Sequence, residues 1–169
     1  MSEQTVTGRL DSFLNEDIID LFITQYLHEL ENAFIYKAFS SWAAVRGYTG
    51  AKAWFQHQME EEMSHANKVR DFLTDAGVNF SIASIPVEKT EVTEYKDMFH
   101  IGLLRETATT DSINNIMVIC GQQKQLLAQE FMNQLLYNQL SEEEEARTRY
   151  QICLNTNDMI LADLKIKQL

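Results

Sequence analysis

The sequence is poor in the residues that interrupt secondary structure. Its 169 residues include only one proline and six glycines, and folds built from many short strands need more turn formers than this. Its two cysteines, Cys120 and Cys153, show no zinc-ligand spacing and are too few for a disulfide framework in a chain of this length. We therefore expect long helices, with both cysteines as small core residues.

The sequence also lacks long uncharged runs and an excess of positive charge. No stretch is apolar enough to span a membrane, and the opening residues 1–7 do not resemble a signal peptide. Lys and Arg number 14 against 25 Asp and Glu, so the net charge is -11, and the surface repels phosphate and anionic lipid. We expect a cytoplasmic protein that binds neither nucleic acid nor membranes.

The length and composition fit one folded unit. Hydrophobic residues make up 45% and charged residues 23%, which is ordinary for a globular protein, and 169 residues suit a single domain. We expect an N-terminal extension over residues 1–14 and a four-helix bundle over 15–155. Residues 156–169 should form a short fifth helix or a tail.

The 3.6-residue period of apolar positions predicts the four helices at about residues 15–45, 51–76, 95–121 and 125–155. Asn15 is the expected N-cap of the first, and Gly77 can take the left-handed conformation that ends the second. Residues 81–94 contain Pro86 and have no helical period, so they form a long connection. Short, long and short connections predict an all-α bundle with one crossover between its second and third helices.

Each predicted helix carries a glutamate within its apolar stripe, close to its middle. These are Glu29, Glu62, Glu106 and Glu142, and His65 follows Glu62 by three residues on the same side of its helix. Because burying an unpaired carboxylate is costly, four such residues at similar depth indicate one shared polar layer.

Charge balance favours a metal site in that layer. Four carboxylates would be neutralised by two divalent cations, with neutral His65 as a further ligand, and mixed oxygen and imidazole ligands suit iron or manganese. Tyr36 and Gln139 fit supporting positions. Each feature alone is common on solvated helices, and a metal-free structural bundle with protonated, paired or outward-facing carboxylates remains an alternative. The other histidines, His28, His57 and His100, are interpreted as surface or packing residues.

Several motifs in this order resemble the non-haem bacterial ferritins over about residues 15–150. They are Glu29-x6-Tyr36-x5-Trp42, Glu61-Glu62-Met63-Ser64-His65-Ala66, Glu106 and Gln139-x-x-Glu142. The resemblance implies a ferritin-like bundle in which Glu29, Glu62 and His65 hold one iron. Glu62 would bridge to a second iron held by Glu106 and Glu142. It further implies Tyr36 as a catalytic residue and Gln139 as a metal-site residue.

The resemblance implies a ferroxidase that oxidises Fe(II) with dioxygen or hydrogen peroxide at a diiron centre and stores ferric mineral in a shell, usually a homo-oligomer of 24 subunits. Gln139-x-x-Glu142 departs from the second Glu-x-x-His of bacterioferritins, so haem is not expected despite Met63. An accessory third iron site is altered, because Asn138 and Ser141 accompany Glu61. The alternative within the same fold is another diiron enzyme, such as a rubrerythrin-like peroxidase or an oxygenase. Rubrerythrins usually add a cysteine-rich module, and this chain has no CxxC.

Overall fold

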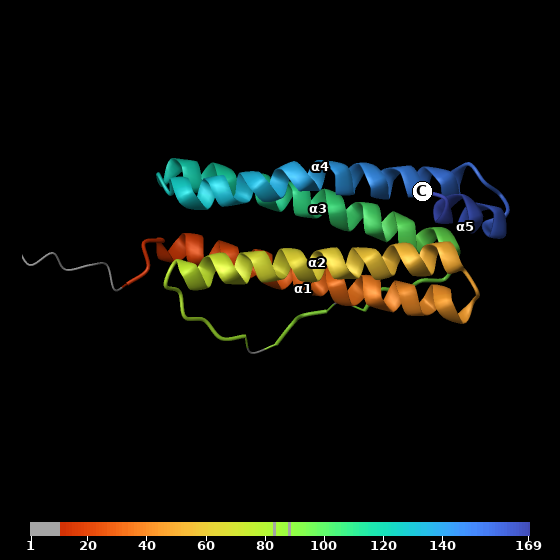
Figure 1. The fold of residues 1–169 in the computed structure, drawn as a ribbon, viewed down its shortest axis with the longest axis horizontal. Coiled ribbons are helices and arrows are strands. Elements are labelled where there is room, and N and C mark those ends of the chain that lie inside the picture. Colours follow the sequence, from red (N-terminus) through yellow and green to blue (C-terminus); the bar gives the residue numbers. More distant parts are fainter. Residues whose placement is uncertain (1–10, 83, 88) are drawn as a thin grey trace, which may run out of the picture.

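The computed structural model describes residues 11–82, 84–87 and 89–169, which include four long helices and one short helix. The helices are α1 (Glu16–Val45), α2 (Thr49–Asp75), α3 (Tyr95–Gln122), α4 (Leu126–Leu154) and α5 (Met159–Lys167) (Figure 1). The predicted all-α bundle with a short fifth helix is confirmed. Residues 1–10 of the expected N-terminal extension lie outside the described residues. None of the described helices is long and apolar enough to cross a membrane.

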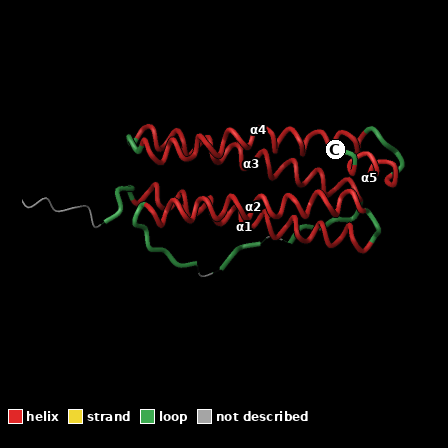
Figure 2. The backbone as a smooth tube through the Cα atoms, in the orientation of Figure 1, coloured by secondary structure: helices red, strands yellow, loops and turns green. Residues whose placement is uncertain are grey.

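The bundle consists of two helical hairpins, α1 with α2 and α3 with α4. The segment between α2 and α3 contains no helix or strand among its described residues and passes along the outside of the α1–α2 hairpin to the opposite end of the bundle (Figure 2). Gly77 begins this segment with a φ of 81°, as its position after α2 predicts. The long crossover between the second and third helices is therefore present.

One helix cap and one helix start differ from expectation. Asn15 occupies the N-cap position of α1, but its side chain makes no capping hydrogen bond. Instead, its amide donates to Gln123 Oε1 at 2.9 Å, at the turn between α3 and α4. The second helix begins at Thr49, two residues before the predicted start at 51.

The core is divided into two apolar clusters with a polar layer between them. One cluster includes Phe39, Phe55 and Phe99 at one end of the bundle, and the other includes Phe22 and Met132 at the opposite end. Both cysteines are buried and unbonded, as expected, one in each cluster. Along each long helix, buried polar residues separate the two apolar sets; they include Gln25, Glu29, Asn32, Glu62, His65, Glu106, Thr109 and Gln139.

Helix α5 packs against the bundle through Ala162 and Ile166 and is also joined to it by one buried carboxylate. Asp163 accepts hydrogen bonds from the backbone N–H groups of Gly50 and Ala51, at 2.9 and 2.8 Å, and from the Tyr95 hydroxyl at 3.0 Å. The first turn of a helix has unpaired N–H donors, so Asp163 caps α2 from a distant part of the chain. Gly50 permits this approach, because a Cβ there would lie 2.2 Å from the Asp163 backbone oxygen.

Replacing Asp163 with Ala is expected to release α5 and destabilise the subunit by about 2–4 kcal/mol, because a helix cap and a charge-assisted hydrogen bond are lost. Thermal unfolding followed by circular dichroism measures the loss of stability, and limited proteolysis detects the released helix. Asp111→Ala, an exposed change on α3, is the matched control. Equal melting temperatures for the two variants would contradict this role of Asp163.

Candidate metal centre

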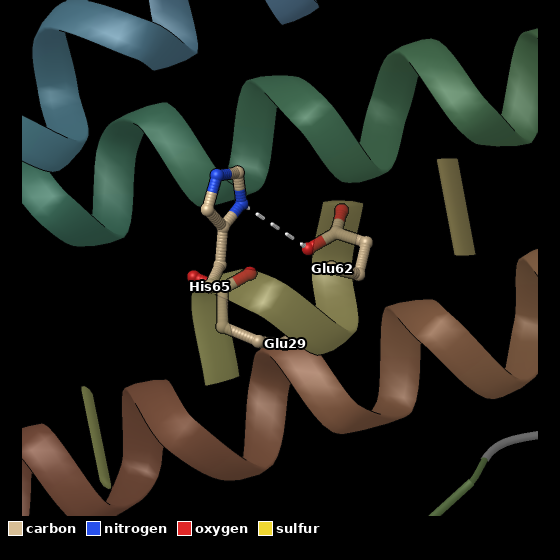
Figure 3. A group of neighbouring side chains, drawn as sticks. All are labelled: Glu29, Glu62 and His65. Carbon is tan, nitrogen blue, oxygen red and sulfur yellow. Dashed lines mark ion pairs between the residues drawn. The ribbon is translucent and has the colours of Figure 1, made fainter. Parts of the chain in front are cut away.

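The polar layer brings Glu29, Glu62 and His65 together inside the bundle. Glu29 lies on the buried face of α1, while Glu62 and His65 share the buried face of α2 because they are three residues apart. One ligand atom from each residue lies within 4.8 Å of the others, and the three residues are only 1%, 3% and 7% exposed. Figure 3 shows the Glu29 side chain directed towards His65 and Glu62 on the neighbouring helix.

Glu106 adjoins this group from α3, with both of its carboxylate oxygens hydrogen-bonded. The Tyr36 hydroxyl donates to Oε1 at 2.5 Å, and the Gln139 amide donates to Oε2 at 2.7 Å. Tyr36 and Gln139 therefore contact a carboxylate of the layer, as their positions in the sequence predict. Hydrogen bonds therefore fix the orientation of the Glu106 carboxylate at both oxygens, whereas Glu29 and Glu62 each accept a side-chain amide bond at one oxygen.

Glu142 adjoins the group from α4 through His65. The His65 ring lies between two carboxylates, with Nδ1 4.0 Å from Glu62 Oε2 and Nε2 3.5 Å from Glu142 Oε1. All seven predicted site residues thus lie in or beside one layer. Of these, Glu29, Glu62 and His65 have ligand atoms that all lie within 4.8 Å of one another.

Burial and mutual repulsion favour protonated carboxyls when no metal is bound. Burial raises the pKa of Glu62 well above its usual range, and the negative charges of Glu29 and Glu106 add to this effect. Burial also raises the pKa of Glu106 to about 7 and that of Glu142 to about 8. The pKa of His65 is lowered by burial, which favours the neutral imidazole that binds metals.

Two carboxylate oxygens in the layer fit a cation. Glu29 Oε2 and Glu62 Oε2 are buried and accept no hydrogen bond from any other residue that the structure describes, so their one contact of this kind is the hydrogen bond between the two carboxyls that helps to raise the pKa of Glu62. A buried oxygen without a donor is costly, and a divalent metal would satisfy both atoms together. Oxygen atoms and one imidazole nitrogen form a donor set suited to iron.

A polar pocket of about 290 Å³ reaches the layer between α2 and α4. His65 and Glu142 line it, together with the acidic residues Glu61 and Glu145. Lys68 lines the pocket as well, so three carboxylates and one positive charge surround this approach to His65. Asn138 and Ser141 line the same pocket, so two of the positions considered for a third iron site carry neutral side chains.

Sequence reasoning missed several polar residues beside the carboxylates. Gln25 and Asn32 of α1 are fully buried and donate to Glu29 and Glu62, and Arg105 of α3 contacts Asn32. Helical spacing could have identified both amides, because they lie four residues before and three after Glu29. His28 is half-buried and lies 2.9 Å from the Thr109 hydroxyl, which agrees with its interpretation as a packing residue.

Comparisons with known proteins agree with the fold. The family model described as "Ferritin-like domain" matches residues 19–153. A bacterial non-heme ferritin of Staphylococcus saprophyticus is 28% identical over 130 residues, covering 77% of this chain and 78% of the relative. A bacterial non-heme ferritin of Staphylococcus haemolyticus is 29% identical over 135 residues, covering 80% and 81%.

Solved structures show the same fold. An open-pore ferritin of the archaeon Archaeoglobus fulgidus superposes with a TM-score of 0.84 at 21% identity, covering 91% of this chain and 98% of that one. The ferritin of M. penetrans gives a TM-score of 0.86 at 19% identity, covering 92% and 97%. The chain belongs to the ferritin family of iron-storage proteins.

Proposed function

We propose that this ferritin oxidises Fe(II) at a diiron ferroxidase centre within each subunit and stores the ferric product in a hollow shell of identical subunits. The buried group of Glu29, Glu62 and His65, with an oxygen on each glutamate that accepts no hydrogen bond from any other described residue, is the observation that carries the proposal. Iron is the substrate here, and dioxygen or hydrogen peroxide is the oxidant. The bacterial non-heme ferritins among its relatives support this reading.

The proposed centre divides its ligands between two irons. Glu29, Glu62 and His65 would hold the first iron, and Glu106 and Glu142 the second, with Glu62 shared. Gln139 and Tyr36 would orient Glu106 through the hydrogen bonds that they donate to it. Burial raises the pKa of the Tyr36 hydroxyl well above its usual range, so Tyr36 keeps its proton and donates a hydrogen bond to Glu106. Haem has no role in this proposal.

Iron binding in this centre is coupled to proton release. Glu62, Glu106 and Glu142 have raised pKa values in the metal-free protein, so Fe(II) displaces protons when it binds. Two Fe(II) ions then balance the four carboxylate charges. Each iron gives one electron to the oxidant, and the Fe(III) product leaves for the interior of the shell.

Assembly into a shell, expected to contain 24 subunits, is part of the same proposal. Family membership supports it, and α5 presents Ile160, Leu161 and Leu164 to solvent in the single chain, as surfaces that contact other subunits commonly do. A cytoplasmic location and the absence of nucleic-acid and membrane partners stay predictions from the sequence.

Aerobic iron loading tests the proposal. Excess Fe(II) is added to the purified metal-free protein, and iron and protein are measured across a size-exclusion column. We expect many irons per chain to elute with a large particle. Two or fewer irons per chain on a small oligomer would replace storage with another diiron oxidase or peroxidase activity, and no bound iron would favour the metal-free structural bundle.

A further inference from the structure

Two buried amides on α1 each hold one oxygen of a glutamate in the proposed centre. Gln25 Nε2 donates to Glu29 Oε1 at 2.6 Å, and Asn32 Nδ2 donates to Glu62 Oε1 at 3.3 Å. In both glutamates the other oxygen, Oε2, is the one that accepts no hydrogen bond from any other described residue. The amides thus occupy one oxygen of each carboxylate and leave the second available.

Each amide is itself held by a donor on α3. Gln25 Oε1 accepts a hydrogen bond from the Ser112 hydroxyl at 2.6 Å, and Asn32 Oδ1 accepts one from Arg105 Nε at 2.7 Å. A side-chain amide accepts only through its oxygen and donates only through its nitrogen. A donor that engages the oxygen therefore turns the N–H group of the same amide towards the carboxylate.

Asn32 links Arg105 to Glu62 by hydrogen bonds. Through this link Arg105 affects the orientation of the Glu62 carboxyl more than its charge. Arg105 Nη2 lies 2.5 Å from Glu31 Oε2, and both side chains are largely buried. This ion pair partly balances the positive charge of Arg105. Thr109 also accepts from Asn32 Nδ2, at 3.3 Å, which further fixes the amide plane.

We propose that Ser112 and Arg105 are positioning residues, which act through Gln25 and Asn32 to keep Glu29 and Glu62 turned for metal binding. The inference rests on the proposed diiron centre. An amide that loses its α3 donor is free to rotate, and its hydrogen bond no longer holds the carboxylate in one orientation. The carboxylate then needs to be reordered when a metal binds, and affinity falls.

Titration of the metal-free protein with Co(II), followed by its visible spectrum and by calorimetry, measures metal affinity in the absence of any oxidation step. We expect Ser112→Ala and Arg105→Leu each to weaken the first Co(II) site by about 10-fold, in the range typical of residues behind metal ligands. Arg105→Lys retains a donor for Asn32 and should restore most of the affinity. With Fe(II) as substrate, KM should rise more than kcat falls.

Two control variants separate positioning from charge and from folding. Arg70→Leu removes an equal charge from an exposed site on α2, and Thr107→Ala removes an exposed hydroxyl from α3. Both should bind Co(II) like the wild type, and every variant is compared by melting temperature and particle size.

Unchanged Co(II) affinity and Fe(II) KM in both Ser112→Ala and Arg105→Leu would overturn the role of these residues. An equal loss in Arg70→Leu, or a loss confined to variants with a lower melting temperature, would overturn it as well. Failure of the wild-type protein to bind Co(II) and oxidise Fe(II) is a different result, because it rejects the diiron centre itself.

Discussion

Replacement of Glu62 by Ala is expected to slow the initial oxidation of Fe(II) by at least about 100-fold, because a lost ligand should exceed the 10- to 100-fold effects of residues behind ligands. Glu62 is the proposed bridge, and its Oε2 lies 4.0 Å from His65 Nδ1. Stopped-flow absorbance of the Fe(III) product, recorded at two Fe(II) ions per subunit, measures the rate.

The same substitution should leave the bundle intact. The Glu62 carboxyl is buried beside other acidic groups that raise its pKa, so its removal relieves repulsion in the metal-free protein. We expect a melting temperature no lower than that of the wild type and an unchanged particle size. Glu60→Ala, an exposed change two residues earlier on α2, should oxidise Fe(II) normally. Wild-type kinetics in Glu62→Ala would remove Glu62 from the centre.

The four long helices could be predicted because each has a sustained apolar period with few glycines, and the one proline, Pro86, lies in the connection between α2 and α3. The exceptions arise from tertiary contacts. The start of α2 at Thr49 depends on Asp163, which accepts hydrogen bonds from the first turn of the helix. Asp163 is more than 110 residues away in the sequence, so the residues around Thr49 do not indicate it. Asn15 fails as a side-chain cap because its amide bonds to Gln123 across the bundle end. Local propensity carries no information about either partner.

The charged part of the site was predictable for a physical reason. A carboxylate inside an apolar stripe is conspicuous, because burial without compensation is unfavourable. This reasoning identified Glu29, Glu62, Glu106 and Glu142, of which the first three are buried and Glu142 is half-buried. The amides of Gln25 and Asn32 carry no charge, and although their spacing from Glu29 places them near it, the sequence does not show which atoms they contact. Their roles depend on which way each amide faces, which only the three-dimensional contacts with Ser112 and Arg105 reveal.

The metal-free protein is expected to lose stability as the pH rises from 6.5 to 8.5. Glu106 and Glu142 keep their protons in the folded state up to about pH 7 and 8, whereas their usual pKa is 4.5. The folded state therefore binds more protons than the unfolded chain over this window, and the free energy of unfolding falls as pH rises. We expect a loss of order 3 kcal/mol per subunit, measured as a lower melting temperature at pH 8.5.

The pH range from 6.5 to 8.5 separates the effect of the glutamates from that of the histidines. Burial lowers the pKa values of His28 and His65, and such groups reduce stability as the pH falls below about 6.5, the opposite direction. The histidine titration that remains just above pH 6.5 raises stability with pH, so it cannot cause a loss. Cys120 and Cys153 ionise in the unfolded chain only near pH 9, so the loss over most of the window reports on the glutamates.

Bound metal should reverse this pH effect, because a divalent cation takes the place of the protons that the glutamates release. Saturating Co(II), about 100 times its dissociation constant, is expected to add about 2.7 kcal/mol or more, and the gain should be larger at pH 8.5 than at 6.5. Glu142→Gln should flatten the pH dependence, since an amide does not titrate, while the exposed control Glu144→Gln should retain it. If Glu142→Gln and the wild type lose equal stability between pH 6.5 and 8.5, the half-buried Glu142 carboxyl does not cause the effect.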